Sequence, residues 1–239
     1  CKAEEIDLPA QSVGIIITSP PYNLGSERWP MGGRPKGKPD GGCRPREAGI
    51  GYDDAMAEGD YRDWQLLVLE HLYTLAMQGA SFFYNHKVRQ ADGTIIHPLY
   101  WLSDPRNPWC IRQEIIWDRG STHNHCPTLF WPEDERIYWL TKGDPMLSAR
   151  PVGMSSVWRF HGPVAGTWHP APFAEELPRR CLQAINLPDL TVLDPFGGSM
   201  TTCAVALDMG YENVIGVDVN PEYIAQSMEY NGWMLRSSL

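Results

Sequence analysis

The stretch that decides the fold class is Val192-Leu193-Asp194-Pro195-Phe196-Gly197-Gly198-Ser199-Met200-Thr201-Thr202. It passes from a short apolar strand, through a turn of small residues, into a helix that begins at Thr201. A second strand (Asn213 to Asp218) and a second helix (Pro221 to Asn231) follow directly, which completes a βαβα unit. Such a unit predicts an α/β fold with a largely parallel sheet, in which ligands bind at the carboxyl ends of the strands.

The turn has the composition of a nucleoside site. Gly197 and Gly198 allow a ligand to approach the backbone closely, and Asp218 ends the next strand, where a carboxylate can accept hydrogen bonds from both ribose hydroxyls. The pattern is neither G-x-G-x-x-G nor a P-loop. An alternative is that Asp194 and Asp218 only cap the strands and helices around them.

A second chemical feature lies near the start of the chain. Val13 to Thr18 is a nearly continuous apolar run, typical of a buried parallel strand, and Ser19-Pro20-Pro21-Tyr22 follows it. Two prolines can simply terminate a strand, because they lack the amide donor and fix φ. They can also hold the Pro20 carbonyl rigidly, so that this carbonyl and the Ser19 oxygen accept both N–H bonds of an aromatic amino group and favour a tetrahedral nitrogen. Tyr22 could then stack on a base extracted from a duplex.

Between these features, short β-rich runs alternate with helical patterns. We expect helices over Tyr61 to Met77 and Glu175 to Ile185, because apolar residues recur there at helical spacing. The expected strands are Ala80 to Tyr84, closed by the polar Asn85-His86-Lys87, then Glu114 to Trp117 and Arg136 to Leu140.

The two chemical features together resemble the β-group DNA amino-methyltransferases. The turn is similar to their motif I, usually written D-P-F-x-G-S-G-T-T, with Met200 where the family usually has glycine. Ser19 to Tyr22 resembles their motif IV, Asp/Asn/Ser-Pro-Pro followed by an aromatic residue. The resemblance implies a Rossmann-like class I fold with a mostly parallel seven-stranded sheet and a circularly permuted motif order, since the catalytic motif comes first and the cofactor motif last.

The resemblance also implies S-adenosylmethionine as cofactor, a ligand without pyrophosphate. Two further segments fit the family: 168–178 resembles motif X, whose helix packs beside the cofactor, and Glu133 to Gly143 resembles motif VIII. The implied catalytic residues are Ser19, Pro20, Pro21 and Tyr22. The implied cofactor-binding residues are Asp194, Pro195, Phe196, Gly197, Gly198, Ser199, Thr201, Thr202 and Asp218, with Thr167, His169 and Phe173 added from motif X.

The target base is less closely constrained than the chemistry. In this family Ser-Pro-Pro is found mainly in N4-cytosine enzymes and Asp- or Asn-Pro-Pro mainly in N6-adenine enzymes, so N4 of cytosine is preferred over N6 of adenine. C5-cytosine chemistry needs a nucleophilic cysteine, usually displayed as Pro-Cys, and the chain contains no Pro-Cys dipeptide. Two other hypotheses are an RNA or amide substrate and a non-catalytic module that keeps the cofactor pocket.

Double-stranded DNA is the expected partner, although the formal net charge is -9. A local basic segment can supply the phosphate contacts, and the Gly- and Pro-rich loop 25–50 carries six basic residues against three acidic ones. The expected DNA contacts are Arg28, Arg34, Lys36, Lys38, Arg44, Arg46 and Arg119. A short recognition segment is expected at about 144–166, and Asn85, His86 and Lys87 lie where a substrate role and simple capping are equally reasonable.

The remaining expectations concern the whole chain. Residues 1–239 fit a single methyltransferase domain with the two segments above as insertions. The start has no apolar signal segment and no run is long enough to span a membrane, so we expect a cytoplasmic protein. His123, His125 and Cys126 lack a second ligand pair at metal spacing, so no metal site is expected. A homodimer and a cognate restriction endonuclease are further partners to consider.

Overall fold

The computed structural model describes residues 1–24, 55–91, 93–120, 130–148, 153–162 and 174–233. Several predicted features lie outside these ranges. They are the basic loop 25–50 with its six arginines and lysines, the three residues considered for a metal, and the motif X residues Thr167, His169 and Phe173.

Strands and helices alternate along most of the described chain. The strands are β1 Val13–Thr18, β2 Ala76–His86, β3 Arg89–Ala91, β4 Thr94–Ile96, β5 Cys110–Asp118, β6 Asp134–Thr141, β7 Val157–Arg159, β8 Val192–Asp194 and β9 Val214–Gly216. The helices are the 3₁₀ turn η1 Ala3–Glu5, then α1 Glu58–Leu75, α2 Leu99–Leu102, α3 Glu176–Ile185, α4 Thr201–Asp208 and α5 Pro221–Asn231.

Seven of the described strands form one sheet in the order β7-β5-β6-β2-β1-β8-β9, and β3 pairs with β4 in a separate hairpin. β1 lies parallel to both β2 and β8, and β8 lies parallel to β9. β6 is antiparallel to its neighbours β2 and β5. The predicted mostly parallel seven-stranded sheet is confirmed, and the two chemical features stand on adjacent strands although 176 residues separate Thr18 from Asp194.

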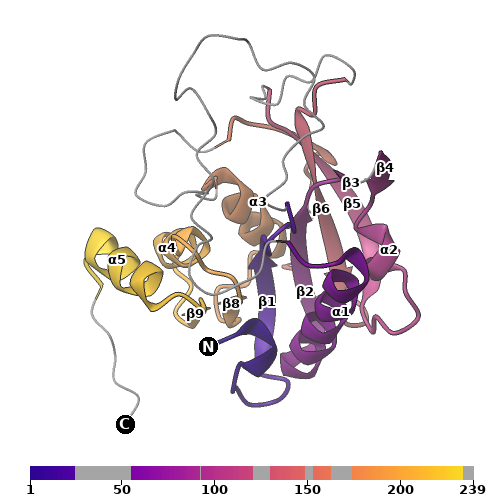
Figure 1. Cartoon of the computed structure of the whole chain (residues 1–239). Helices are drawn as coiled ribbons and strands as arrows, with labels where there is room; N and C mark the ends of the chain where they lie inside the picture. The colour runs from indigo at the N-terminus through magenta and orange to yellow at the C-terminus, as the bar shows by residue number, and fades with distance from the viewer. Residues whose placement is uncertain (25–54, 92, 121–129, 149–152, 163–173, 234–239) are drawn as a thin grey trace.

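The central parallel strands β1 and β8 are buried on both faces, as expected in a parallel sheet covered by helices. Alternate residues of a strand point to opposite faces, so Ile16 belongs to one core, and Ile15 and Ile17 to the other. The first core includes α1 and α2, and the second includes α3 and α4; Figure 1 shows the corresponding layers on the two sides of the sheet. The parallel strands β1, β2, β8 and β9 finish at one edge of the sheet, and the site described below lies there.

Some boundaries differ from the sequence expectations. α1 begins at Glu58, before the apolar pattern starts, and β2 follows at Ala76 with no intervening loop. β2 also continues through Asn85 and His86, because β6 pairs with it as far as His86 opposite Arg136. The β3–β4 hairpin, α2 and β7 were not predicted. β7 lies within the expected recognition segment and extends the sheet beside β5.

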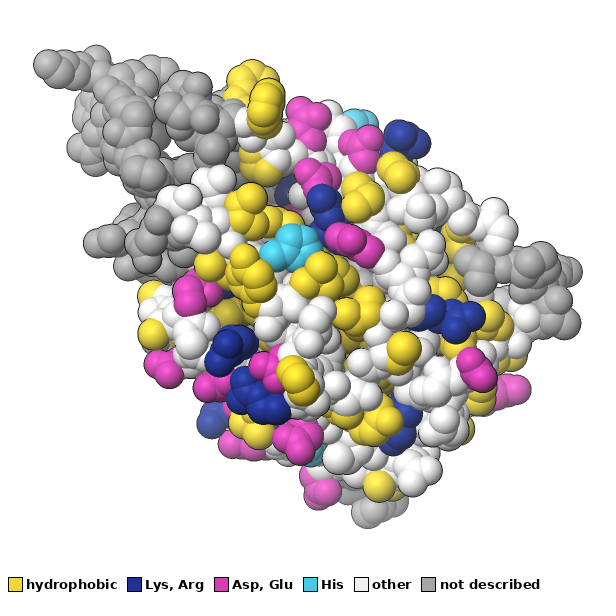
Figure 2. Space-filling model, turned by 90° about the vertical axis from the view of Figure 1, so that its right-hand side faces the viewer, with side chains coloured by type: hydrophobic (Ala, Val, Ile, Leu, Met, Phe, Trp, Pro, Cys, Tyr) yellow, Lys and Arg dark blue, Asp and Glu magenta, His cyan; other side chains and the backbone are white. Residues whose placement is uncertain are grey.

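None of the helices in the described ranges is both long enough and apolar enough to cross a membrane. On the face of the molecule in Figure 2, basic and acidic side chains are interspersed, and among its described residues neither sign gathers into a broad patch.

Candidate active site

The predicted catalytic corner lies at the carboxyl end of β1, and the Tyr22 hydroxyl is at its centre. This hydroxyl lies 2.7 Å from Ser19 Oγ, 3.0 Å from Asn85 Oδ1 and 3.1 Å from Glu135 Oε2. Burial, together with the nearby Glu135 carboxylate, raises the Tyr22 pKa well above its ordinary value. Tyr22 therefore stays a neutral phenol that can both donate and accept a hydrogen bond.

Asn85 and Glu135 reach the corner from two neighbouring antiparallel strands. Asn85 is near the end of β2 and Glu135 near the start of β6, which the pairing of β2 with β6 brings to the same edge of the sheet. Glu135 is only 8% exposed, and its other oxygen accepts a hydrogen bond from Arg119 Nη1 at 2.8 Å. The carboxylate is thus paired with a cation, as a buried charge must be to avoid a large desolvation cost.

The second proline of the corner is fixed from α1. Tyr61 Oη donates to the Pro21 carbonyl at 2.6 Å, and Gln65 Nε2 donates to Tyr61 Oη at 2.8 Å. His86 Nε2 lies 2.8 Å from the same hydroxyl, and burial lowers the His86 pKa to about 3. The imidazole is therefore neutral at physiological pH.

Asn23, the residue after the corner, has a left-handed backbone conformation and is held in place by hydrogen bonds. Asn23 has a φ of +54°, and its side chain bonds Met56 through both Nδ2 and Oδ1 and bonds Glu58 through Nδ2. Arg89 donates to the Asn23 carbonyl at 3.0 Å and pairs with both Glu58 oxygens. The corner from Pro20 to Asn23 is consequently held by side chains from α1 and β3 as well as by its own prolines.

The corner and the cofactor turn are directly connected. Thr18 Oγ1 donates to Asp194 Oδ1 at 2.7 Å, and Phe196 N donates to the same oxygen at 3.1 Å. Asp194 is 4% exposed, and burial raises its pKa from 3.8 to about 6, although the Thr18 hydrogen bond acts in the opposite direction. Asp194 is a buried carboxylate that accepts hydrogen bonds but forms no ion pair with any residue of the described ranges, so a positively charged ligand would stabilise its ionised form.

The glycines of the turn bring β8 and β9 together. Gly197 N donates to the Val217 carbonyl at 2.7 Å, and Gly198 N donates to Asp218 Oδ2 at 2.8 Å. The other Asp218 oxygen accepts from Asn220 N at 2.8 Å. The Asp218 carboxylate is thereby held two residues beyond the end of β9, directly beside the glycine turn, and its role in binding a ribose stays a prediction.

Met200 occupies the position at which the family motif has glycine. Its φ is +57°, in the left-handed region that glycine adopts at least cost, and it is 4% exposed. A Cβ placed on Gly197 or Gly216 would clash with Met200 Sδ, so the Met200 side chain fills the space that these glycines leave. Methionine is tolerated here because two glycines accommodate its side chain.

The structure brings together most of the predicted site residues that it describes. Ser19 to Tyr22 and Asp194 to Asp218 meet at one edge, and Phe196 packs edge-on against Trp64 with ring centroids 5.8 Å apart. Arg119, predicted to contact DNA, is held by Glu135 and lies over the Trp117 ring, 5.5 Å from its centroid. No group of three or more potential metal ligands occurs among the described residues.

Three residues of the site have no role assigned from the sequence alone: Thr18, Tyr61 and Glu135. Thr18 is the only polar side chain in an otherwise apolar strand, and Glu135 opens the motif VIII strand with a charge. Both are signals that a polar partner is required nearby. Tyr61 carries no such signal, because it belongs to the apolar pattern of its helix.

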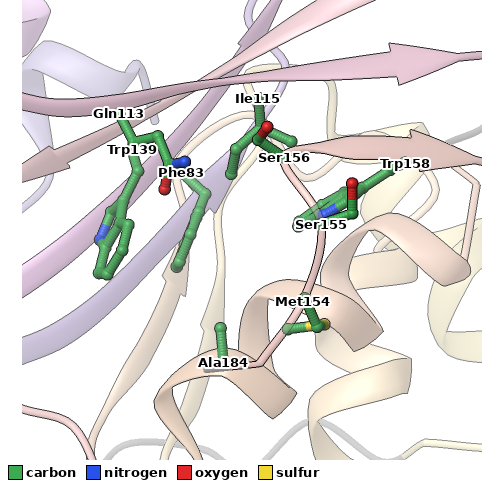
Figure 3. A pocket seen from close by; sticks show the side chains of 9 residues that line it. All are labelled: Phe83, Gln113, Ile115, Trp139, Met154, Ser155, Ser156, Trp158 and Ala184. Carbon is green, nitrogen blue, oxygen red and sulfur yellow. The ribbon is translucent and has the colours of Figure 1, made fainter. Parts of the chain in front are cut away.

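A small cavity lies away from this edge, against the second core. It has a volume of about 30 Å³ and lies between the sheet, through Phe83, Ile115 and Trp139, and Ala184 of α3 (Figure 3). Such a volume accommodates a single water molecule, so the cavity is not a nucleoside site.

Comparison with known proteins places the chain in a family. The family model described as DNA methylase, for N6 and N4 methyltransferases, matches residues 13–229. The type II methyltransferase M.ScaI of Streptomyces caespitosus is 23% identical over 91% of this chain and 74% of its own length. The DNA adenine methyltransferase YhdJ of Escherichia coli is 26% identical over 95% of this chain and 78% of its own length.

Solved structures share the fold. The cytosine-N4-specific PvuII DNA methyltransferase has a TM-score of 0.71 at 19% identity, covering 100% of this chain and 86% of its own. A DNA modification methylase of Thermus thermophilus, described as complexed with S-adenosyl-L-methionine, has a TM-score of 0.64 at 20% identity, covering 97% and 92%. These matches confirm the class I fold, and the family supports S-adenosylmethionine as the cofactor. The chain belongs to the DNA methylase family of N6 and N4 amino-methyltransferases.

Proposed function

We propose that this protein transfers a methyl group from S-adenosylmethionine to the exocyclic N4 of a cytosine that has been flipped out of double-stranded DNA. The observation that carries the proposal is the junction of the two motifs. The Thr18–Asp194 hydrogen bond sets the Ser19-Pro20 corner directly beside the glycine turn. Methyl transfer requires this arrangement, because donor and acceptor must be held in line within a few ångströms.

The residues present fit the cofactor. Asp218 would accept hydrogen bonds from the ribose, Gly197 and Gly198 allow close backbone approach, and the buried Asp194 carboxylate favours a cationic ligand. Pro195, Phe196, Ser199, Thr201 and Thr202 complete the turn, and Thr167, His169 and Phe173 are proposed to close it. S-adenosylmethionine supplies an electrophilic methyl group activated by a sulfonium.

The corner would act on the target amino group. Its nitrogen is a poor nucleophile while its lone pair is conjugated with the ring. Ser19 Oγ and the Pro20 carbonyl would accept its two N–H bonds and turn the lone pair towards the methyl group, with the acceptors fixed in advance. The ring of Tyr22 would stack on the flipped base. The basic residues between Arg28 and Arg46, with Arg119, are proposed to hold the DNA, and a homodimer and a cognate endonuclease stay predictions.

N6 of adenine is the second candidate. The similarity to YhdJ, described as an adenine methyltransferase, supports it, whereas the Ser-Pro-Pro sequence supports cytosine. The test is incubation of the purified protein with unmethylated DNA and labelled S-adenosylmethionine, followed by nucleoside analysis. N4-methylcytosine supports the proposal, N6-methyladenine establishes the alternative, and the absence of both would reject DNA amino-methylation. Ser19→Ala serves as the matched inactive control.

A further inference from the structure

The hydrogen-bond partners of Tyr22 determine which way the Ser19 hydroxyl points. A tyrosine hydroxyl has one proton to donate, and the Tyr22 oxygen has three neighbours: Ser19 Oγ, Asn85 Oδ1 and Glu135 Oε2. The position of that single proton follows from what each neighbour can do.

Asn85 presents an acceptor to Tyr22. Its Nδ2 donates to the Arg136 carbonyl at 3.0 Å, and a backbone carbonyl can only accept. This contact fixes the orientation of the amide, which places Oδ1 towards the Tyr22 hydroxyl. Asn85 is 1% exposed, so solvent does not offer it another arrangement.

Glu135 presents a second acceptor. Arg119 Nη1 donates to Oε1 at 2.8 Å, which leaves Oε2 facing Tyr22. A carboxylate has no proton to give, so the Tyr22 proton is shared between Glu135 and Asn85. The remaining contact, between Tyr22 and Ser19, must then use the Ser19 proton. Ser19 therefore donates to Tyr22 and directs its lone pairs elsewhere.

The direction of this hydrogen bond matters because a serine hydroxyl can either donate or accept. Only when Ser19 accepts a hydrogen bond from the target amino group can the lone pair of that nitrogen leave conjugation with the ring. A carboxylate at this position would accept without any help, whereas a serine needs its own proton drawn away. The Tyr22 hydroxyl is placed to do this.

We propose that Glu135, acting through Tyr22, is a positioning residue that holds Ser19 as a hydrogen-bond acceptor and takes up the proton that the methylated amino group must lose. The proposal rests on the proposed function. Methyl transfer leaves the nitrogen with a positive charge and one surplus proton. An N–H bond of the base breaks as an O–H bond forms on Ser19, the Ser19 proton passes to Tyr22, and the Tyr22 proton passes to Glu135.

The charges balance in this transfer. A cationic base and a carboxylate become a neutral base and a carboxylic acid, and Ser19 and Tyr22 end as neutral hydroxyls. Each hop runs along an existing contact, of 2.7 Å and then 3.1 Å. Burial disfavours a free tyrosinate, so the two hops are expected to be concerted.

The test is single-turnover methylation of unmethylated bacteriophage DNA by the wild type, Glu135→Gln, Tyr22→Phe and the double variant. Tyr22→Phe keeps the stacking ring and removes only the relay hydroxyl. Glu114→Gln is the matched control, because Glu114 is also a strand carboxylate paired with an arginine, Arg136, but does not contact the corner. S-adenosylmethionine affinity is measured alongside by calorimetry, and folding by circular dichroism.

We expect Glu135→Gln and Tyr22→Phe each to lower the methyl-transfer rate roughly 100-fold, within the range of general acid–base effects, with cofactor affinity changed less than twofold. The double variant is expected to be no slower than the slower single variant, because both changes interrupt the same relay. Glu114→Gln should match the wild type.

The relay would be overturned if Glu135→Gln had the wild-type rate. It would also be overturned if the rate loss of the double variant were the product of the two single losses, because the two residues would then act independently. Neither result would contradict the proposed methyltransferase activity. A wild type that methylates no DNA would instead overturn the proposed function, so the two failures are distinguishable. If Glu135→Gln does not fold, Tyr22→Phe alone decides, since the relay predicts a slow enzyme with intact cofactor binding and the absence of a relay predicts a normal rate.

Discussion

Thr18 and Asp194, which lie 176 residues apart in the chain, share a buried hydrogen bond of 2.7 Å between Oγ1 and Oδ1. Thr18 is the residue directly before the proposed catalytic corner, and Asp194 opens the proposed cofactor turn. The bond exists because β1 and β8 are neighbours in the sheet, with Ile16 opposite Leu193. It couples the position of the proposed methyl acceptor to that of the donor.

Removing the Thr18 hydroxyl should lower both the stability of the protein and its affinity for S-adenosylmethionine. Thr18→Val keeps the shape of the side chain but deprives Asp194 of its donor, so we expect a loss of about 1 to 3 kcal/mol in the free energy of unfolding. S-adenosylmethionine affinity should fall roughly fivefold or more. Urea unfolding and calorimetry measure the two effects, with the exposed Thr74→Val as the control. A variant as stable and as tightly binding as the wild type would contradict the coupling.

Cofactor affinity should depend on pH through Asp194. Its pKa is about 6 in the free protein because the carboxyl is buried. A cationic ligand beside it lowers this value, so binding below pH 6 must expel a proton and is weakened. We expect the affinity for S-adenosylmethionine to rise roughly tenfold from pH 5 to pH 7 and to level off above that. Asp194→Asn should remove the dependence, and a persistent rise in this variant would assign it to another group.

Stability should fall on mild acidification because of His86. Its pKa is lowered by burial from 6.5 to about 3, so between these values the unfolded chain binds a proton that the folded protein does not. Stability from this group is therefore present above pH 6.5 and is lost as pH falls below it, by about 2 kcal/mol down to pH 5. Asp194, with a raised pKa, acts in the opposite direction over much of this window.

Single variants separate the two groups. Urea unfolding across pH 5 to 7 should show a smaller decline towards acid for His86→Gln than for the wild type, and a larger one for Asp194→Asn. Identical slopes in all three proteins would show that neither group titrates as its burial implies.

Met200 should be energetically coupled to the glycine opposite it. Met200→Gly relieves the left-handed backbone, by about 1 kcal/mol, but empties a filled space, which costs more, so the variant should be less stable by about 1 to 3 kcal/mol. Gly216→Ala should also destabilise, since the new Cβ clashes with Met200. In the double variant the clash with Met200 is absent and only the contact of the new Cβ with Cys203 Sγ is left, so the combined loss should be smaller than the sum. Additive losses in urea unfolding would show that the two residues do not interact.

Much of the site could be predicted because its chemistry is local in sequence. Gly, Pro, Ser and Asp residues mark where the strand, turn and helix begin and end in residues 192–202. They mark the end of the strand in residues 13–22 in the same way. The partners of Tyr22 could not be found in this way. Asn85 and Glu135 meet only because β2 and β6 pair in one register, and a slip of one residue would turn their side chains to the opposite face.

The unpredicted elements have a similar explanation. β7 has three residues and exists through its pairing with β5, and the β3–β4 hairpin is equally short, so neither produces a periodic pattern. The sequence shows that Met200 departs from the family motif but not how it is accommodated, because Gly216, which makes room for it, lies on the next strand.

Amino-methylation at the Ser19-Pro20 corner is tested most directly by nucleoside analysis of unmethylated DNA after incubation with the wild type or with Ser19→Ala and labelled S-adenosylmethionine. Labelled N4-methylcytosine is expected with the wild type, and Ser19→Ala, which lacks one of the two proposed amino-group acceptors, should yield at least about 100-fold less. Label on neither N4 of cytosine nor N6 of adenine, or equal label with both proteins, would contradict it.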